Sequence, residues 1–294
     1  MTLASCDSRK TAGENPFFTE WDTPHGVPPF DKILPEHFMP AFERGMSLHE
    51  AEIDAITSNK DEATFENTIL AYDNAGQMLA QTELVFGMLC AAETNDRMQA
   101  LQEQAMPLLA AHRDKIRLDD KLFVRVKEVY DRRAALGLDA EQMRLLQKTY
   151  DSFVRAGALL DAEQKARLKE INGQLSLTAV KFGNNILAEN NNFVLELKSD
   201  ELDGLPAGIR DAAREKAQQM GKGDKWVFTL HKPSLIPLLT YSTRRDLREK
   251  IYKAYLNRCN NGDEYDNKQL INDFIRLRTE KAHLLGYPSY AAYV

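Results

Sequence analysis

Cysteine pairs, closely spaced histidines and long apolar runs are all missing from this 294-residue sequence. Three widely spaced cysteines, Cys6, Cys90 and Cys259, predict neither a disulfide framework nor a cysteine-ligated zinc site. No run approaches the roughly 20 apolar residues that a membrane-spanning helix needs. Excess positive charge is missing as well, because 38 basic and 44 acidic residues give a net charge of −6. That balance argues against a nucleic-acid-binding protein, which needs a basic face for phosphates.

The histidines are too far apart for a zinc pair on one helix, because no two of them are closer than twelve residues. Such a pair needs histidines at positions i and i+4, where both imidazoles leave the same face. His49 and Glu50 begin like that motif, but the fifth position is Ile53. Cys90 lies among apolar neighbours, which predicts a buried, inert thiol. By residue chemistry alone, the sequence predicts no catalytic and no metal-binding residue in this chain.

A basic cluster near residue 250 is the one conspicuous concentration of charge. Its members are Arg244, Arg245, Arg248, Lys250 and Lys253, and they alternate with Asp246 and Glu249. Opposite charges at these spacings are typical of a solvated helix face, which the pattern favours over a binding patch.

Residues 1–15 differ from the rest, and Leu3-Ala-Ser-Cys6 is similar to a bacterial lipobox. In that motif the cysteine thiol receives the lipid, and the polar run to Asn15 would serve as a flexible tether. No apolar signal core precedes the motif, so a working signal would require a start upstream of Met1. The motif favours lipid attachment at Cys6 and a lipoprotein in the bacterial cell envelope, facing the periplasm or the surface. A chance match in a cytoplasmic protein is the alternative.

From residue 16 the apolar spacing predicts a mainly α fold with one small two-stranded β ribbon. A helix is expected to begin near Pro35, and a long apolar stripe predicts one helix over 64–93. Further helices are predicted over 95–118, 120–136, 206–220, 243–258 and 266–285. Asp139 and Asp161 each open an Asp-x-x-Gln capping box, where a further helix begins. Residues 193–197 and 226–230 alternate with period two and are predicted to pair as strands.

A series of motifs in a fixed order runs through this helical region. They are Asn15-Pro-Phe-Phe18, Pro28-Pro-Phe-Asp-Lys-Ile33, Thr64-Phe-Glu-Asn-Thr-Ile69, Trp226–Leu230 before a Pro-Ser-x-x-Pro run, Tyr252-x-Ala-Tyr-x-x-Arg258, Asp266-Asn267 and Leu284-Leu-Gly-Tyr287. In these residues the chain resembles bacterial peptidyl-dipeptidases, which belong to the thimet oligopeptidase family of zinc metallopeptidases. The resemblance covers essentially everything from Asn15 to Val294.

The resemblance implies that residues 16–294 are the helical N-terminal region of a longer enzyme, without its catalytic zinc domain. In the family, zinc is held by a His-Glu-x-x-His helix and a further glutamate, and none of these has a counterpart here. The parent enzyme is expected to bind zinc and to hydrolyse short peptides by releasing dipeptides from the C-terminus. This region is expected to form the N-terminal wall of a channel, to pair with the missing C-terminal catalytic half and to be inactive alone. A non-catalytic, lipid-anchored helical binding module is the alternative.

Overall fold

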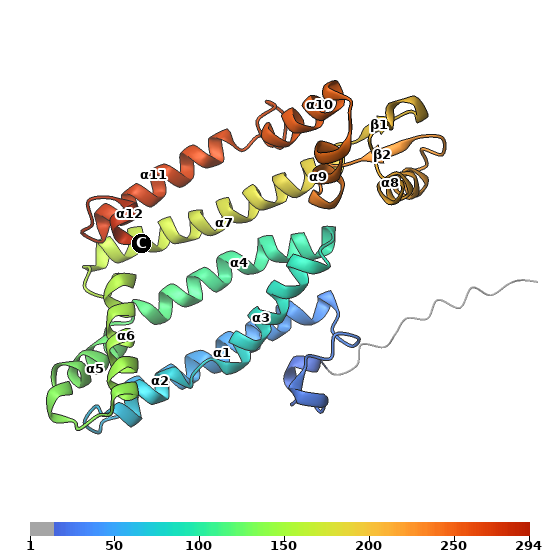
Figure 1. The fold of residues 1–294 in the computed structure, drawn as a ribbon. Coiled ribbons are helices and arrows are strands. Elements are labelled where there is room, and N and C mark those ends of the chain that lie inside the picture. The colour runs from blue at the N-terminus through green and yellow to red at the C-terminus, as the bar shows by residue number, and fades with distance from the viewer. Residues whose placement is uncertain (1–14) are drawn as a thin grey trace, which may run out of the picture. The chain divides into compact units, whose positions relative to one another are not determined.

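The computed structural model describes residues 15–294, and Figure 1 shows them as a mainly helical chain with one β ribbon. The predicted fold class is confirmed. The chain divides into two compact units, of which the second is Thr178–Arg278. The first comprises the described residues up to Leu177 together with Thr279–Val294. Cys6 and the predicted tether up to residue 14 lie outside the described residues, so their assignment stays a prediction.

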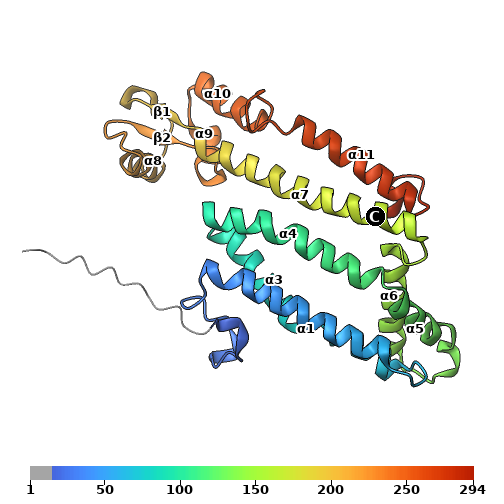
Figure 2. The same cartoon turned by 180° about the vertical axis from the view of Figure 1, so that it is seen from behind.

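The first unit is built from helices joined by short turns. In chain order these are α1 (Phe38–Ser58), α2 (Ala71–Asp73), α3 (Gln77–Ala92), α4 (Asp96–Arg117), α5 (Asp120–Asp131), α6 (Ala140–Ala156) and the beginning of α7 (Ala162–Asn192), with the end of α11 (Lys268–Leu284) and α12 (Tyr290–Tyr293). α1 lies along α3, and α4 contacts both, as Figure 2 shows. α5 packs against α1 and α6. No helix among residues 15–294 combines the length and the apolar content that crossing a bilayer requires.

Two apolar clusters hold the first unit together. Around the start of α1, the Phe86 ring lies edge-on to Phe38 and Phe42, with centroids 4.9 and 5.3 Å apart. A second cluster gathers Ile53, Leu122, Phe153 and their neighbours from α1, α5 and α6. Aromatic side chains in such edge-to-face pairs contribute beyond the apolar area that they bury.

Both predicted capping boxes are confirmed. The Gln142 and Gln164 backbone N–H groups donate to the carboxylates of Asp139 and Asp161 over 2.9 and 2.8 Å. Each glutamine side chain accepts a hydrogen bond from the backbone N–H of its aspartate in return. These bonds satisfy donors that the first turn of a helix leaves free, so α6 and α7 begin where the sequence places them.

The prediction of one helix over 64–93 is wrong. A π-helical turn, Phe65–Leu70, leads into α2, and α3 begins only after Gly76. Gly76 has a positive φ of 75°, and a Cβ there would lie 2.9 Å from Nδ1 of His49. Its N–H donates to Glu52 over 2.7 Å. Contacts with α1 therefore interrupt the helix at a glycine, which tolerates this backbone conformation.

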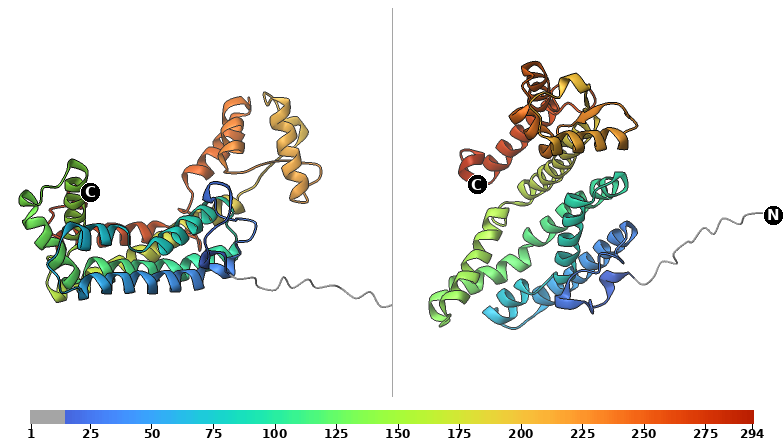
Figure 3. Two further views of the ribbon diagram at one scale, coloured as in Figure 1. Left: turned by 90° about the horizontal axis from the view of Figure 1, so that it is seen from below. Right: turned by 45° about the vertical axis from the view of Figure 1, so that its right-hand side comes forward.

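In the second unit, β1 (Leu195–Leu197) pairs antiparallel with β2 (Trp226–Phe228), as predicted. α8 (Ala207–Gln219) lies against β2, and α9 (Lys232–Tyr241) contacts both α8 and α10 (Arg245–Leu256), as Figure 3 helps to follow. The later part of α7 and the beginning of α11 complete the unit. Its core includes Leu195, Phe228, Leu238 and Ile251, each at most 2% exposed.

Candidate functional site

The family resemblance implies zinc, which needs three or four converging side-chain ligands. Among residues 15–294, no three histidine, cysteine, aspartate or glutamate side chains are placed to hold a metal ion. Ile53 stands where a zinc motif starting at His49 would need its second histidine, and its side chain is buried in the core. The described residues therefore do not fit a zinc site, and no catalytic step through zinc is assigned to them.

The two cysteines in the described part of the chain are free, and Cys259 has a neighbouring cation, Arg258, whose effect is smaller than that of burial. Burial raises the pKa of Cys90 to about 11. The pKa of Cys259 is also raised to about 11, by burial first and by Glu189 second. At neutral pH both groups are thiols rather than nucleophilic thiolates, in agreement with the inert role predicted for Cys90.

A histidine pair joins α1 to α4 inside the first unit. Nε2 of His112 lies 3.0 Å from Nδ1 of His49, and His112 is 5% exposed. On its other side, Nδ1 of His112 lies 3.5 Å from Glu50, whose second oxygen pairs with Lys115 at 2.8 Å. A close contact between two ring nitrogens needs a proton on one and a lone pair on the other. The contact therefore requires at least one of the two imidazoles to be neutral, and it ties two helices together.

This pair predicts acid sensitivity of the first unit. Burial lowers the pKa of both His49 and His112. This outweighs the nearby carboxylates, since Glu50 raises the pKa of both histidines and Glu52 raises that of His49. Near and below pH 6.5, the two imidazoles therefore bind protons more readily in the unfolded chain than in the folded chain. We expect the free energy of unfolding to fall as pH drops from 7.5 to 5.5, and to fall less steeply in His112→Gln. Urea unfolding at several pH values measures both slopes, and equal slopes would contradict the prediction.

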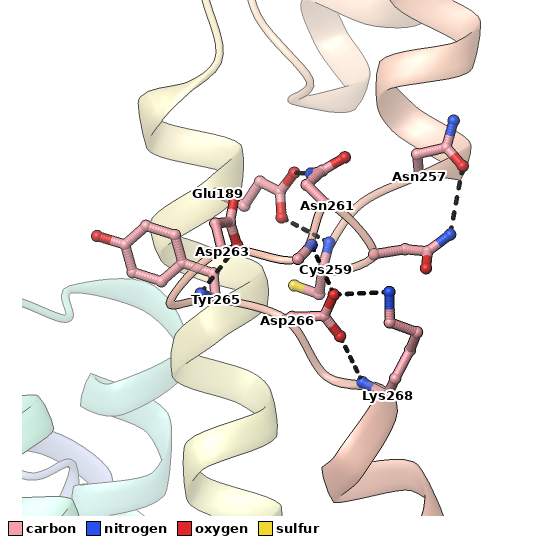
Figure 4. Close-up of polar contacts among 10 residues, drawn as sticks. Glu189, Asn257, Cys259, Asn261, Asp263, Tyr265, Asp266 and Lys268 are labelled. Atoms are coloured by element: carbon pink, nitrogen blue, oxygen red, sulfur yellow. Dashed lines mark hydrogen bonds and ion pairs between the residues drawn. The ribbon is translucent and has the colours of Figure 1, made fainter.

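The loop between α10 and α11 contains the Asp266-Asn267 motif and is organised by hydrogen bonds to α7, shown in Figure 4. One oxygen of Glu189 accepts the Cys259 backbone N–H over 2.5 Å, and its other oxygen accepts the Asn261 amide. Asp266 accepts the N–H groups of Gly262 and Lys268 over 2.7 and 2.9 Å. The Lys268 ammonium, which bonds to the same carboxylate, holds the pKa of Asp266 below its usual value.

Two further motif residues, Asn267 and Arg258, also hold the loop between α10 and α11 in place. The side chain of Asn267, 2% exposed, donates to the Phe182 carbonyl over 3.2 Å and accepts from Asn185 over 2.8 Å. Arg258 donates to Asn190 and lies over the Tyr255 ring, 3.8 Å from its centroid. Buried amides and guanidinium groups need such partners, so these residues fix the loop on α7. They form a scaffold rather than a reactive site.

The described residues of the second unit also form a groove where α9 meets α10, with a volume of about 420 Å³. We call it the basic groove. It is lined by Leu239 from α9 and by Arg245, Arg248, Glu249, Tyr252 and Lys253 from α10. On α10 these residues recur at helical spacing and therefore share one face. Three cations and one carboxylate leave the groove positively charged, above an apolar surface provided by Leu239 and Tyr252.

Ion pairs occupy part of the predicted basic cluster. Arg244 pairs with Asp246 at 2.7 Å and Lys253 pairs with Glu249 at 2.5 Å, as expected of a solvated helix face. Arg248 donates to the Ser242 carbonyl. Arg245 is exposed and makes no direct hydrogen bond or ion pair with the described residues, but together with Lys253 it lowers the pKa of Glu249. These cations are visible in the sequence, but the apolar surface beside them arises only when α9 packs on α10.

Sequence comparison finds peptidases that are similar to this chain. Residues 238–294, which include the basic groove and the Asp266 loop, match the profile of peptidase family M3. The dipeptidyl carboxypeptidase of Escherichia coli is 36% identical over 280 residues, which cover 95% of this chain and 41% of that protein. Its Salmonella typhimurium counterpart is 34% identical with the same coverage. Oligopeptidase A of Escherichia coli is 27% identical, covering 92% of this chain and 40% of that protein.

These matches confirm the resemblance to the thimet oligopeptidase family, and the chain is similar to a part of its dipeptidyl carboxypeptidases. It spans about two fifths of the length of the relatives that it matches.

Proposed function

We propose that this chain is the substrate-binding, non-catalytic part of a zinc peptidase that releases dipeptides from the C-terminus of short peptides. Sequence similarity over 95% of the chain to dipeptidyl carboxypeptidase supports this assignment most directly. The absence of a three-ligand cluster among residues 15–294 is consistent with zinc being held by residues outside this chain. This region would then contribute to one wall of the channel that admits peptides.

The packing observed in the chain suits such a supporting role. Glu189 and the motif residues Asp266 and Asn267 fix the backbone of a loop, and both described cysteines are thiols of raised pKa. Positioning a substrate requires side chains held by rigid elements rather than a reactive group of their own. The basic groove lies on two packed helices and meets that requirement.

A chimera tests the proposal. We expect that this chain, replacing the matching 280-residue segment of Escherichia coli dipeptidyl carboxypeptidase, supports zinc-dependent peptide hydrolysis, whereas the chain alone hydrolyses nothing. An enzyme that lacks its metal site loses a rate enhancement of many orders of magnitude. Mass spectrometry of the products shows whether dipeptides are released.

The controls separate folding from function. The same enzyme with the segment deleted should be inactive, and circular dichroism and zinc content should show that the chimera is folded and loaded. A folded, zinc-loaded chimera without activity would overturn the proposal. Peptide hydrolysis by the purified chain alone would overturn it as well.

A further inference from the structure

We propose that a cleft in the second unit, where α8, β2 and the beginning of α9 meet, binds a small apolar carboxylic acid that has no amino group. We call it the α8 cleft. α8 packs against β2 and contacts α9, and Figure 1 labels all three elements. The α8 cleft has a volume of about 280 Å³ and shares no lining residue with the basic groove. The inference therefore goes beyond the proposed peptidase function and does not depend on it.

Most of the surface that lines the α8 cleft is apolar. Ile209 and Ala213 lie four residues apart on α8 and therefore share one face of that helix. Val227 and Phe228 of β2 and Pro233 of α9 supply further apolar surface. A volume of about 280 Å³ is near the lower end of the roughly 300–1,000 Å³ that small-ligand sites span. The walls and the size of the cleft therefore suit one small apolar group.

The polar side chains that line the α8 cleft can all donate hydrogen bonds, and none of them is an acid. They are Lys216, Thr229, His231 and Ser234. Lys216 is exposed, and its ammonium makes no hydrogen bond or ion pair with the described residues. α9 begins beside these donors, and the positive end of its dipole favours the same sign of ligand charge. The cleft therefore favours an anion, and its side chains offer no carboxylate to pair with an ammonium group on the ligand.

The hydroxyl of Thr229 is independent evidence for a polar ligand. Thr229 is 7% exposed, and its hydroxyl makes no hydrogen bond with any described residue. Its backbone N–H donates to the Ser234 hydroxyl over 3.0 Å, which leaves the Ser234 proton free to donate. Buried polar groups almost always have a partner. A carboxylate in the cleft would supply an acceptor for both hydroxyls and a counter-charge for Lys216.

Two pairs of ligands that differ in a single group test the inference. 3-Phenylpropionate and its uncharged amide, 3-phenylpropanamide, are each titrated into the purified chain by isothermal titration calorimetry. Hydrogen bonds to a charged group are the stronger ones, so we expect the acid to bind roughly tenfold more tightly or better. Phenylalanine differs from 3-phenylpropionate only by its ammonium group, and we expect it to bind roughly tenfold more weakly or not at all. Equal affinities within either pair, or no saturable binding of 3-phenylpropionate, would overturn the inference.

Variants locate the contact. Lys216→Gln should weaken binding of 3-phenylpropionate roughly tenfold. Lys250→Gln removes the same charge at an exposed position of α10 outside the cleft and should leave the affinity unchanged. Thr229→Val keeps the shape of the side chain and should weaken binding about two- to tenfold. It should not lower the stability of the unliganded chain in urea, because the hydroxyl that it removes has no partner among the described residues. Equal affinities of Lys216→Gln and Lys250→Gln would overturn the inference.

Competition by simple ions distinguishes a site for an apolar acid from a general anion site. Inorganic phosphate or acetate that displaces 3-phenylpropionate at an equal concentration would overturn the inference, because neither ion has an apolar body for the walls of the cleft. None of these measurements involves zinc or hydrolysis. Their outcome and that of the chimera are therefore independent of each other.

Discussion

Replacing Arg125 by methionine should destabilise the first unit by about 3 kcal/mol or more. Arg125 lies on α5 and is only 9% exposed. Its guanidinium donates to the backbone carbonyls of Asn59 and Asp61 over 2.9 and 3.2 Å and to the Asn67 side chain over 3.1 Å. Methionine fills similar space but donates nothing, so these acceptors lose a charged donor. Each hydrogen bond to a charged group contributes about 1.5–3 kcal/mol, and unpaired buried acceptors add a desolvation cost.

The acceptors of Arg125 belong to the segment that joins α1 to the π-helical turn. Asn67 caps this turn, since its side chain accepts the Thr64 N–H over 2.8 Å while its own N–H donates to the Thr64 hydroxyl over 3.1 Å. Loss of Arg125 therefore loosens a cap as well as a loop. Arg125→Lys should retain part of the stability, because one ammonium cannot reproduce the spacing of the guanidinium fork.

Urea unfolding of the whole chain measures the effect, with Arg144→Met as the matched control. Arg144 is exposed on α6 and has no hydrogen-bond or ion-pair partner among the described residues. A surface substitution of this kind usually stays within about 0.5 kcal/mol. If Arg125→Met and Arg144→Met unfold at the same urea concentration, the network around Arg125 contributes nothing measurable to stability.

Nothing in the sequence distinguishes Arg125 from a solvated residue, and the reason is general. Leu122, Phe123, Val126 and Val129 form an apolar stripe at helical spacing in this helix, and all four are buried. Arg125 lies beside that stripe, where a charged residue is normally exposed. Its burial depends on carbonyl groups more than sixty residues earlier in the chain. Local periodicity carries no information about such a partner.

The difference between local and distant contacts also separates the elements that were predicted from those that were not. The capping boxes at Asp139 and Asp161 were predicted because all their atoms lie within four consecutive residues. The break at Gly76 was missed because the residues that contact it, Glu52 and His49, lie on another helix. α9 was not predicted either, since Pro233 and Pro237 resemble helix breakers.

The candidate site follows this rule too. Arg245 and Arg248 were visible in the sequence as a basic cluster, but Leu239 joins them only through the packing of α9 on α10. The motif residues Asp266 and Asn267 were recognised from the family resemblance, and their hydrogen bonds show what they do. Spacing alone could not have shown that they hold a loop on α7.

The close approach of Gly204 to the end of α9 gives the second large expected effect, a loss of more than about 3 kcal/mol on substitution by alanine. Gly204 has a φ of +83°, and an added Cβ would lie 2.2 Å from the Tyr241 carbonyl oxygen and 3.0 Å from the Thr243 backbone nitrogen. Neither backbone atom can move without disturbing the Thr243 N–H bond to the Asp203 carbonyl, which measures 3.1 Å. A left-handed backbone alone costs an alanine about 1–2 kcal/mol, and the steric clash adds to this cost.

Gly221→Ala isolates the backbone contribution. Gly221 has a similar φ of +68° in the same unit, but an added Cβ would meet no atom within 4 Å. We therefore expect Gly221→Ala to cost only about 1–2 kcal/mol, and the difference between the two variants to report the clash with Tyr241. Urea unfolding gives the two free energies, and hydrogen exchange should show faster opening of α9 in Gly204→Ala alone. Equal stability of the two variants would mean that the backbone at the end of α9 can move away from the added Cβ without a measurable loss of stability. The Ser242 carbonyl, which follows Tyr241 and accepts from Arg248, would then be a poor anchor for the basic groove.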